Sequence, residues 1–170
     1  MHTSARHIHY NLKGVFPNNY KDLLKLKGVG PYTSAAISSI CFNEKRAVVD
    51  GNVYRVLSRV FNIKTAINSH LGIKTFQKLA DSLISQSNPG DYNQGIMDLG
   101  AIICINKPKC HSCPLNIICI AKKTNKINKL PIKIKNNIIK PRYFNYLYIE
   151  FKDEFLMKKR TDNDIWKNLY

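Results

Sequence analysis

Apolar residues recur at three- and four-residue spacing through most of the first 104 positions, which is the pattern of helices that bury one face. The pattern predicts helices over residues 17–26, 31–42, 51–61, 76–86 and 92–104. Asn18, Asp50 and Asp91 stand where N-caps are expected, because their side chains can accept from free backbone N–H groups. Cys41, within a small and apolar helix, is expected in the core. This part of the chain is therefore predicted to be mainly α.

The pattern changes after residue 142. Residues 143–151 and 154–159 are rich in aromatic and branched side chains and are separated by Lys152-Asp153, which predicts a β-hairpin. Because an isolated hairpin is only marginally stable, we expect residues 143–170 to be the start of a β domain.

A basic segment joins the two patterns. Residues 122–142 carry eight basic residues and no acidic one, and Pro131 and Pro141 interrupt any helix. We expect an extended basic linker, which divides the chain into residues 1–121, 122–142 and 143–170.

Length and composition limit the class of protein. The 170 residues are 44% hydrophobic, enough for a core. No apolar run reaches the roughly 18 residues of a membrane span, and the first residues lack the apolar block of a signal peptide. We expect a soluble, cytoplasmic monomer with no membrane partner. In reducing cytosol a cysteine cluster more often binds metal than forms disulfides.

The charge balance points to a polyanionic partner. Lys and Arg number 27 against 11 Asp and Glu, a net charge of +16. Neutralising phosphates and releasing their counterions is the main source of affinity for nucleic acid. Simple solubility, or an AT-rich coding sequence, would also account for many lysines.

The segment LKGVGPYTSAAI, residues 26–37, places Gly28 and Gly30 between two predicted helices, the second beginning at Pro31. The glycines permit a tight turn, and free N–H groups at the second helix start suit a phosphate oxygen. This is how a helix-hairpin-helix holds a DNA backbone. An ordinary turn between packed helices is the alternative.

The segment AVVDGNVYRVLSR, residues 47–59, places Asp50 after apolar residues and before a predicted helix. A helix cap is the simplest interpretation. A carboxylate in this position is also placed to stabilise the oxocarbenium ion that forms when a glycosidic bond breaks, and the two roles are compatible.

The segment CINKPKCHSCPLNIIC has the spacing C-x5-C-x2-C-x5-C. Zinc sites usually combine two C-x2-C pairs, and only Cys110 and Cys113 form one here. Four thiolates on a compact loop can also ligate a [4Fe-4S] cluster. Spacing alone leaves iron-sulfur and zinc equally open, and His111 is not needed as a ligand.

These three motifs, in this order, resemble those of the helix-hairpin-helix DNA glycosylases that carry an iron-sulfur cluster, the endonuclease III and MutY superfamily. The chain is most similar to the MutY branch. Tyr32 stands where the endonuclease III branch has its nucleophilic lysine, and Gly51-Asn52 follows Asp50 where that branch has Thr-His. MDLGAIIC, residues 97–104, followed by a linker and a β segment, is also similar to the MutY branch and to the start of its Nudix-like domain.

The resemblance implies a hydrolase of base excision repair that flips adenine, mispaired with 8-oxoguanine or guanine, out of double-stranded DNA and cleaves its N-glycosidic bond. It would act in the cytoplasm, on the nucleoid. Asp50 would be the catalytic carboxylate, supported by Tyr32 and Asn52. Other implied roles are DNA contacts by Lys27, Gly28, Val29, Gly30, Lys107 and Lys109, and ligation of a structural [4Fe-4S] cluster by Cys104, Cys110, Cys113 and Cys119.

Two features depart from the family pattern. The glutamate that protonates adenine, found in a motif like SEVMLQQT, has no counterpart in the sequence, and the first cysteine spacing is one residue short. We therefore expect a fragment truncated at both ends. One alternative is a DNA-binding fragment without catalysis, since losing a general acid costs about 10² to 10⁴-fold. An endonuclease III-like lyase is a further alternative, disfavoured by Tyr32.

Overall fold

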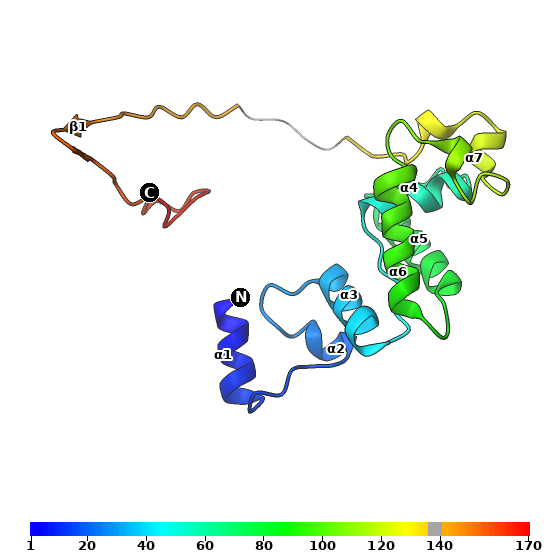
Figure 1. Cartoon of the computed structure of the whole chain (residues 1–170), viewed down its shortest axis with the longest axis horizontal. Coiled ribbons are helices and arrows are strands. Elements are labelled where there is room, and N and C mark those ends of the chain that lie inside the picture. Colours follow the sequence, from blue (N-terminus) through cyan, green and yellow to red (C-terminus); the bar gives the residue numbers. More distant parts are fainter. Residues whose placement is uncertain (136–140) are drawn as a thin grey trace. The chain divides into compact units, whose positions relative to one another are not determined.

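The computed structural model describes residues 1–135 and 141–170, and the chain divides into two compact units, Met1–Lys135 and Asn136–Tyr170 (Figure 1). Each unit is described by itself. The predicted linker positions 136–140 lie outside the described residues.

The first unit is helical, as predicted (Figure 1). Its elements in chain order are α1 (His2–Asn11), α2 (Tyr20–Leu23), α3 (Pro31–Phe42), α4 (Gly51–Val60), α5 (His70–Leu83), α6 (Pro89–Asp98), the π-helical turn η1 (Leu99–Ile103), the 3-10 turn η2 (Cys110–Ser112), α7 (Ile120–Lys123) and the 3-10 turn η3 (Ile127–Lys129). None of the described helices is both long and apolar enough to cross a membrane.

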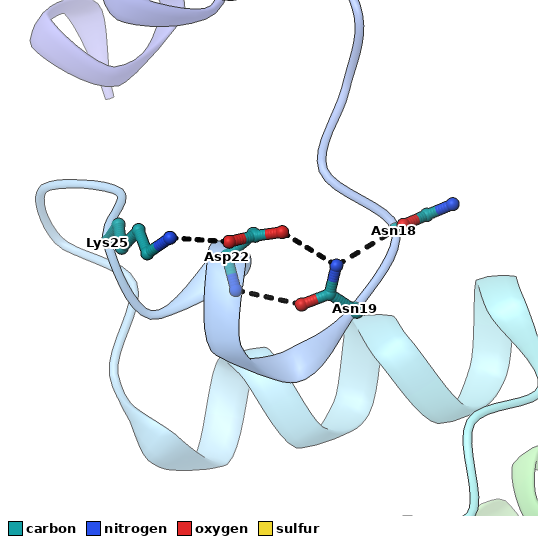
Figure 2. Close-up of polar contacts among 4 residues, drawn as sticks. All are labelled: Asn18, Asn19, Asp22 and Lys25. Carbon is teal, nitrogen blue, oxygen red and sulfur yellow. Dashed lines mark hydrogen bonds and ion pairs between the residues drawn. The ribbon is translucent and has the colours of Figure 1, made fainter.

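The N-cap predictions were right at one helix and wrong at two. Asp50 caps α4, since its side chain accepts from the backbone N–H of Val53. The cap of α2 is Asn19 rather than Asn18, and Asn19 accepts from the N–H of Asp22 at 3.0 Å (Figure 2). At α6 the cap position is Asn88, and Asp91 lies in the first turn. In each wrong case the helix begins one to three residues from the predicted start, which is the usual uncertainty of helix ends.

The acid in the first turn of α2 is held by its neighbours. Lys25 and Asn19 donate to the two oxygens of Asp22 at 2.6 and 2.7 Å (Figure 2). The hydrogen bonds from Lys25 and then Asn19 lower the pKa of this carboxyl below its usual value. The short helix is thereby fixed at its start, immediately before the hairpin that leads to α3.

Two features of the helices were not predicted. Helix α1 buries none of its residues, so it leaves no apolar periodicity to detect. Cys41 is exposed, and its expected place in the core was wrong. The buried face of α3 instead consists of small residues, Ser34, Ala35, Ser38 and Ser39.

The core of the first unit forms between α4 and α5. Phe76 of α5 is fully buried and meets Tyr54 of α4 edge to face, with ring centroids 5.1 Å apart. Around this pair lie Ala47, Val53, Leu57, Ile67, Ala80 and Ile84. Helix α4 also contacts α6, η1 and α7, so its remaining faces are covered as well (Figure 1).

Helices α3 and α6 pack closely through small residues and one buried amide. A Cβ added to Gly90 would come within 3.0 Å of the backbone of α3. Asn93 of α6 is fully buried and donates to the hydroxyl of Ser39 at 2.8 Å and to the carbonyl of Arg46 at 2.9 Å. Its Oδ1 accepts from the N–H of Val48 at 3.0 Å. Asn93 therefore fixes the extended segment that leads into Asp50.

The first part of the predicted basic linker lies in the first unit. Leu130 is buried, and the strand-like stretch beyond it pairs with the loop before α5. Ile67 donates to the carbonyl of Ile132 at 2.9 Å, and the Asn68 side chain bonds both the N–H and the carbonyl of Ile134. These residues carry their lysines on a fixed path along the helical unit.

The described part of the second unit contains the predicted hairpin. β1 (Glu150–Phe151) and β2 (Glu154–Phe155) pair antiparallel around Lys152-Asp153. Each strand is only two residues long, shorter than the pattern indicated. Nearby, Arg142 donates to Asp164 at 2.6 Å, and hydrogen bonding from Arg142 lowers the pKa of that carboxyl.

Replacing Asn93 by Ala is expected to destabilise the first unit by about 3 kcal/mol, because the buried partners of its amide lose their hydrogen bonds. Denaturant unfolding followed by circular dichroism measures the effect. Gln94→Ala, at an exposed amide on the same helix that bonds Asp98, is the matched control and should change stability by no more than about 0.5 kcal/mol. Equal effects of the two substitutions would contradict the role assigned to Asn93.

Candidate functional site

Asp50 is a half-buried carboxylate fixed at the start of α4. Its Oδ1 accepts from the backbone N–H of Val53 at 2.8 Å, and its Oδ2 accepts from the side-chain amide of Asn52 at 3.0 Å. The extended segment before it is tied down by Asn93. Both oxygens therefore have one defined partner, and the carboxylate keeps one orientation.

The amide of Asn52 is oriented in turn by Arg55, one turn further along α4. The Nη2 group of Arg55 donates to Asn52 Oδ1 at 2.7 Å and to the carbonyl of Gly100 at 2.7 Å. Its Nε donates to the carbonyl of Cys104 at 2.6 Å. A continuous set of hydrogen bonds thus runs from Asp50 to the backbone of the first cysteine of the loop.

The approach of η1 to α4 depends on a glycine. A Cβ added to Gly100 would lie 2.6 Å from Asn52 Cβ and 2.9 Å from the Asn52 carbonyl oxygen. Such distances are shorter than real Cβ contacts, so any side chain here would push η1 away from the start of α4. The site around Asn52 was predicted from the sequence, but its dependence on Gly100 and Arg55 was not.

The predicted hairpin joins α2 and α3. Gly28 has φ +86°, a left-handed conformation that favours glycine. Gly30 caps α3, and Pro31 occupies the first helical turn. Within the described residues, the backbone N–H groups of Gly28 and Gly30 have no intrachain acceptor, whereas the N–H of Val29 bonds the carbonyl of Leu26. Lys27 is exposed beside them. The turn therefore presents two donors and a cation.

Tyr32 lies at the start of α3 with 49% of its surface exposed, and its hydroxyl lies 3.8 Å from the sulfur of Met97. It lines an open cavity together with Val49, next to Asp50 in the chain, and Tyr54. Asp50 and Asn52 are not among the residues that line this cavity. The structure thus brings Tyr32 to the neighbourhood of Asp50 without a direct contact between them.

The four clustered cysteines line one cavity, which is walled on the other side by α4 and η1. Burial, followed by the proximity of Cys119, Cys104 and Cys113, raises the pKa of the Cys110 thiol. All the cysteines are free of disulfides. The loop therefore gathers the four thiols as the sequence predicted.

The spacing of these thiols was examined against two kinds of metal group. Tetrahedral zinc with Zn–S bonds of about 2.3 Å needs its sulfurs within about 4 Å of one another. Among the described residues, no three His, Cys, Asp or Glu side chains are gathered closely enough to hold a single ion. In an iron-sulfur cluster each thiolate binds a different iron, so the four sulfurs lie farther apart. The arrangement fits the larger group better.

Two basic residues of the cysteine loop, Lys107 and Lys109, are exposed. Lys109 also lines the cysteine cavity through its stem, while Lys107 does not. The loop thus places positive charge on the surface directly outside the four thiols.

Arg59 is a second residue that the sequence interpretation missed. It lies four residues after Arg55 on α4 and is buried, and it contacts the cysteine loop. A signal was present, because an arginine at this spacing within an apolar helix falls on the same face as Arg55.

Comparison with known proteins gives the same picture. A family model described as the helix-hairpin-helix motif matches residues 11–40, which contain α2, the turn and most of α3. Over 171 aligned residues the chain is 35% identical to an adenine DNA glycosylase of Buchnera aphidicola subsp. Acyrthosiphon pisum, covering 100% of this chain and 49% of that protein. It is 41% identical to the adenine DNA glycosylase of Homo sapiens, covering 70% of this chain and 22% of that protein. The chain therefore spans half or less of the length of these relatives.

Solved structures show the same fold. A thermostable thymine-DNA glycosylase is 36% identical with a TM-score of 0.65, covering 72% of this chain and 56% of that one. An endonuclease III bound non-covalently to DNA matches at 24% identity with a TM-score of 0.59 over the same shares, which supports the fold alone. The helical unit thus has the helix-hairpin-helix glycosylase fold.

Replacing Gly100 by Ala is expected to displace η1 from α4 and disturb the Asn52–Arg55 hydrogen bonds, lowering the unfolding free energy by about 1–3 kcal/mol through overpacking. Gly95→Ala on α6 is the control, since a Cβ there meets nothing within 4 Å. That control should be neutral or stabilising by up to about 1 kcal/mol because alanine favours helix. Thermal unfolding of both variants checks the pair, and a neutral Gly100→Ala would contradict the close approach.

Proposed function

The chain belongs to the adenine DNA glycosylase family, and we propose that it provides the catalytic carboxylate, the DNA-binding hairpin and the cofactor loop of an enzyme that removes adenine mispaired with 8-oxoguanine or guanine in double-stranded DNA. The observation that carries the proposal is the fixed carboxylate of Asp50. The reaction is hydrolysis of the N-glycosidic bond in base excision repair, on chromosomal DNA in the cytoplasm.

At the reacting centre, Asp50 would stabilise or transiently capture the sugar cation. An oxocarbenium ion forms as the bond to the base breaks, and a carboxylate held in one orientation stabilises it without reorganising. Asn52 and the Val53 N–H hold that carboxylate, each using one oxygen. Tyr32, beside Val49 in the adjoining cavity, would contact the flipped nucleotide.

The hairpin would hold the DNA backbone. The N–H groups of Gly28 and Gly30 point out of a turn at the start of the 12-residue helix α3, where phosphate oxygens are favoured. Lys27 adds charge, and Val29 closes the turn through its bond to Leu26. Backbone donors of this kind position DNA without reading its sequence.

The cysteine cavity would hold a [4Fe-4S] cluster through Cys104, Cys110, Cys113 and Cys119. The support is the common cavity of the four thiols and their separation, which suits a cluster better than one zinc ion. When bound, such a group links the loop to α4 and keeps Lys107 and Lys109 in place for DNA. It supplies structure, and the hydrolysis is assigned to the residues around Asp50.

The second unit would contribute the first strands of a Nudix-like β domain. The support is the hairpin at residues 150–155, at the turn that the sequence indicated. The aromatic residues that flank it are largely exposed, as expected of strands that pack against further partners.

Replacing Asp50 by Asn tests the catalytic assignment. The neutral amide keeps the shape of the cap but cannot stabilise a cation, so adenine release should fall by about 10² to 10³-fold or more. The measurement is release of adenine from a duplex with one adenine opposite 8-oxoguanine, alongside duplex binding, which should not change. Asp91→Asn, in the exposed first turn of α6, is the matched control and should keep full activity.

Three other outcomes distinguish the alternatives. Unchanged adenine release by the Asp50→Asn chain would overturn the catalytic role. A chain that retains the duplex and its cofactor but releases no adenine would support the DNA-binding alternative. An adduct trapped with borohydride would indicate an endonuclease III-like lyase instead.

The basic loop is tested by salt dependence. Lys107→Ala and Lys109→Ala together should reduce the slope of log K against log salt by about two, because each lysine that neutralises a phosphate contributes about one. Fluorescence anisotropy of a labelled duplex at several salt concentrations measures the slope. Lys74→Ala with Lys78→Ala on α5 is the control pair, and an equal loss there would show that only total charge matters.

A further inference from the structure

Arg59 carries a charge into the interior of the first unit. It is the ninth residue of α4, and only 4% of its surface is exposed. Moving a charged side chain out of water is costly unless the charge is paired or bound by strong acceptors. The position therefore requires a partner that can balance a guanidinium.

The hydrogen bonds of Arg59 go mainly to neutral carbonyl oxygens. Nη1 donates to Ile105 at 2.7 Å and to Cys104 at 3.3 Å, and Nη2 lies 3.5 Å from the carbonyl of Asn106. On the other side, Nε is shared between the carbonyls of Ile127 and Leu130, each at 3.2 Å. These acceptors satisfy the donors but bring no full negative charge.

No carboxylate pairs with Arg59 among residues 1–135 and 141–170. The described ion pairs involve Lys25, Arg142 and Arg160 only. A buried cation with only neutral partners is an unfavourable arrangement. Its counter-charge must therefore come from a group of another kind.

The cysteines are the groups beside Arg59 that can carry negative charge. Nη1 of Arg59 lies 3.4 Å from Cys104 Sγ, and the sulfur of Cys119 lies 3.5 Å from the Arg59 carbonyl oxygen. Arg59 also lines the cavity shared with Cys110 and Cys113. The guanidinium thus borders the cavity of all four thiols.

We propose that Arg59 is the internal counter-charge of the metal group in this cavity and positions its first ligand, Cys104. Four thiolates bring more negative charge than an iron-sulfur core brings positive charge, so the loaded site is a net anion. A charge-assisted hydrogen bond from Arg59 then stabilises that anion. The inference rests on the proposed [4Fe-4S] cofactor.

The same contacts fix the shortest part of the ligand loop. Arg59 binds the carbonyls of Cys104, Ile105 and Asn106, three consecutive residues at the start of the five-residue spacing to Cys110. This is the spacing that is one residue shorter than the family pattern. Arg59 therefore sets the path of the loop where its length leaves the least slack.

The test compares Arg59→Met and Arg59→Lys with the wild-type chain, each purified with its metal. Arg59→Met removes the charge from a side chain of similar length, and cluster loss to a chelator should be faster by about 10- to 100-fold, the usual effect of removing an outer-shell partner. The reduction potential of the cluster that remains should fall, because a nearby positive charge favours the reduced form. Iron and sulfide content, visible absorbance and voltammetry supply the readouts.

Arg59→Lys keeps the charge and should recover most of the retention and of the potential. Arg46→Met is the matched control, since that arginine stacks on Tyr20 and lines a different cavity. The proposal is overturned if Arg59→Met keeps the wild-type potential and retention, or if Arg59→Lys is as defective as Arg59→Met. A wild-type chain that contains zinc, or no iron and sulfide, would instead contradict the cofactor itself.

Discussion

The guanidinium groups of Arg55 and Arg59 are the constraint on which the arrangement of the first unit depends. Both project from α4 and donate to backbone carbonyls of η1 and the cysteine loop. The last carbonyls of a helix lack partners within it and carry partial negative charge, so they suit a cation with several donors. A lysine could not replace either residue fully, because one ammonium group cannot reach acceptors spread over several turns. Helix α4 is thereby held to the segment that contains its cofactor loop.

The start of α4 is fixed by a different kind of contact. Asn93 bonds the backbone on both sides of Ala47, and small residues let α3 and α6 approach closely around it. The segment before Asp50 is therefore rigid through buried hydrogen bonds, while the segment after Asp50 is rigid through its helix. A carboxylate at such a junction keeps its orientation without contacts of its own to a large core, which agrees with its half-buried position.

The sequence predicted the elements whose signals are local. The periodic helices, the Gly28–Gly30 turn, the cap at Asp50, the hairpin at Lys152-Asp153 and the gathering of the four cysteines all depend on neighbouring residues, and all are present. Helix α1 was missed because it buries nothing, and Cys41 was misplaced because α3 packs through serines. The contacts of Arg55, Arg59 and Gly100 join residues about 45 positions apart. Such contacts depend on tertiary packing, which composition and spacing do not reveal.

Helix α4 carries the two parts of the site at its two ends. Asp50 caps its start, and Arg59 borders the cysteine cavity near its end. With a rise of about 1.5 Å per residue, these positions are about 14 Å apart along the helix. A group bound by the cysteines would therefore not touch atoms that react at Asp50. Its influence would pass through the hydrogen bonds from Cys104 to Arg55, Asn52 and Asp50, which connect the loop to the carboxylate. The position of the cysteine loop and the orientation of the carboxylate are accordingly linked through one face of one helix.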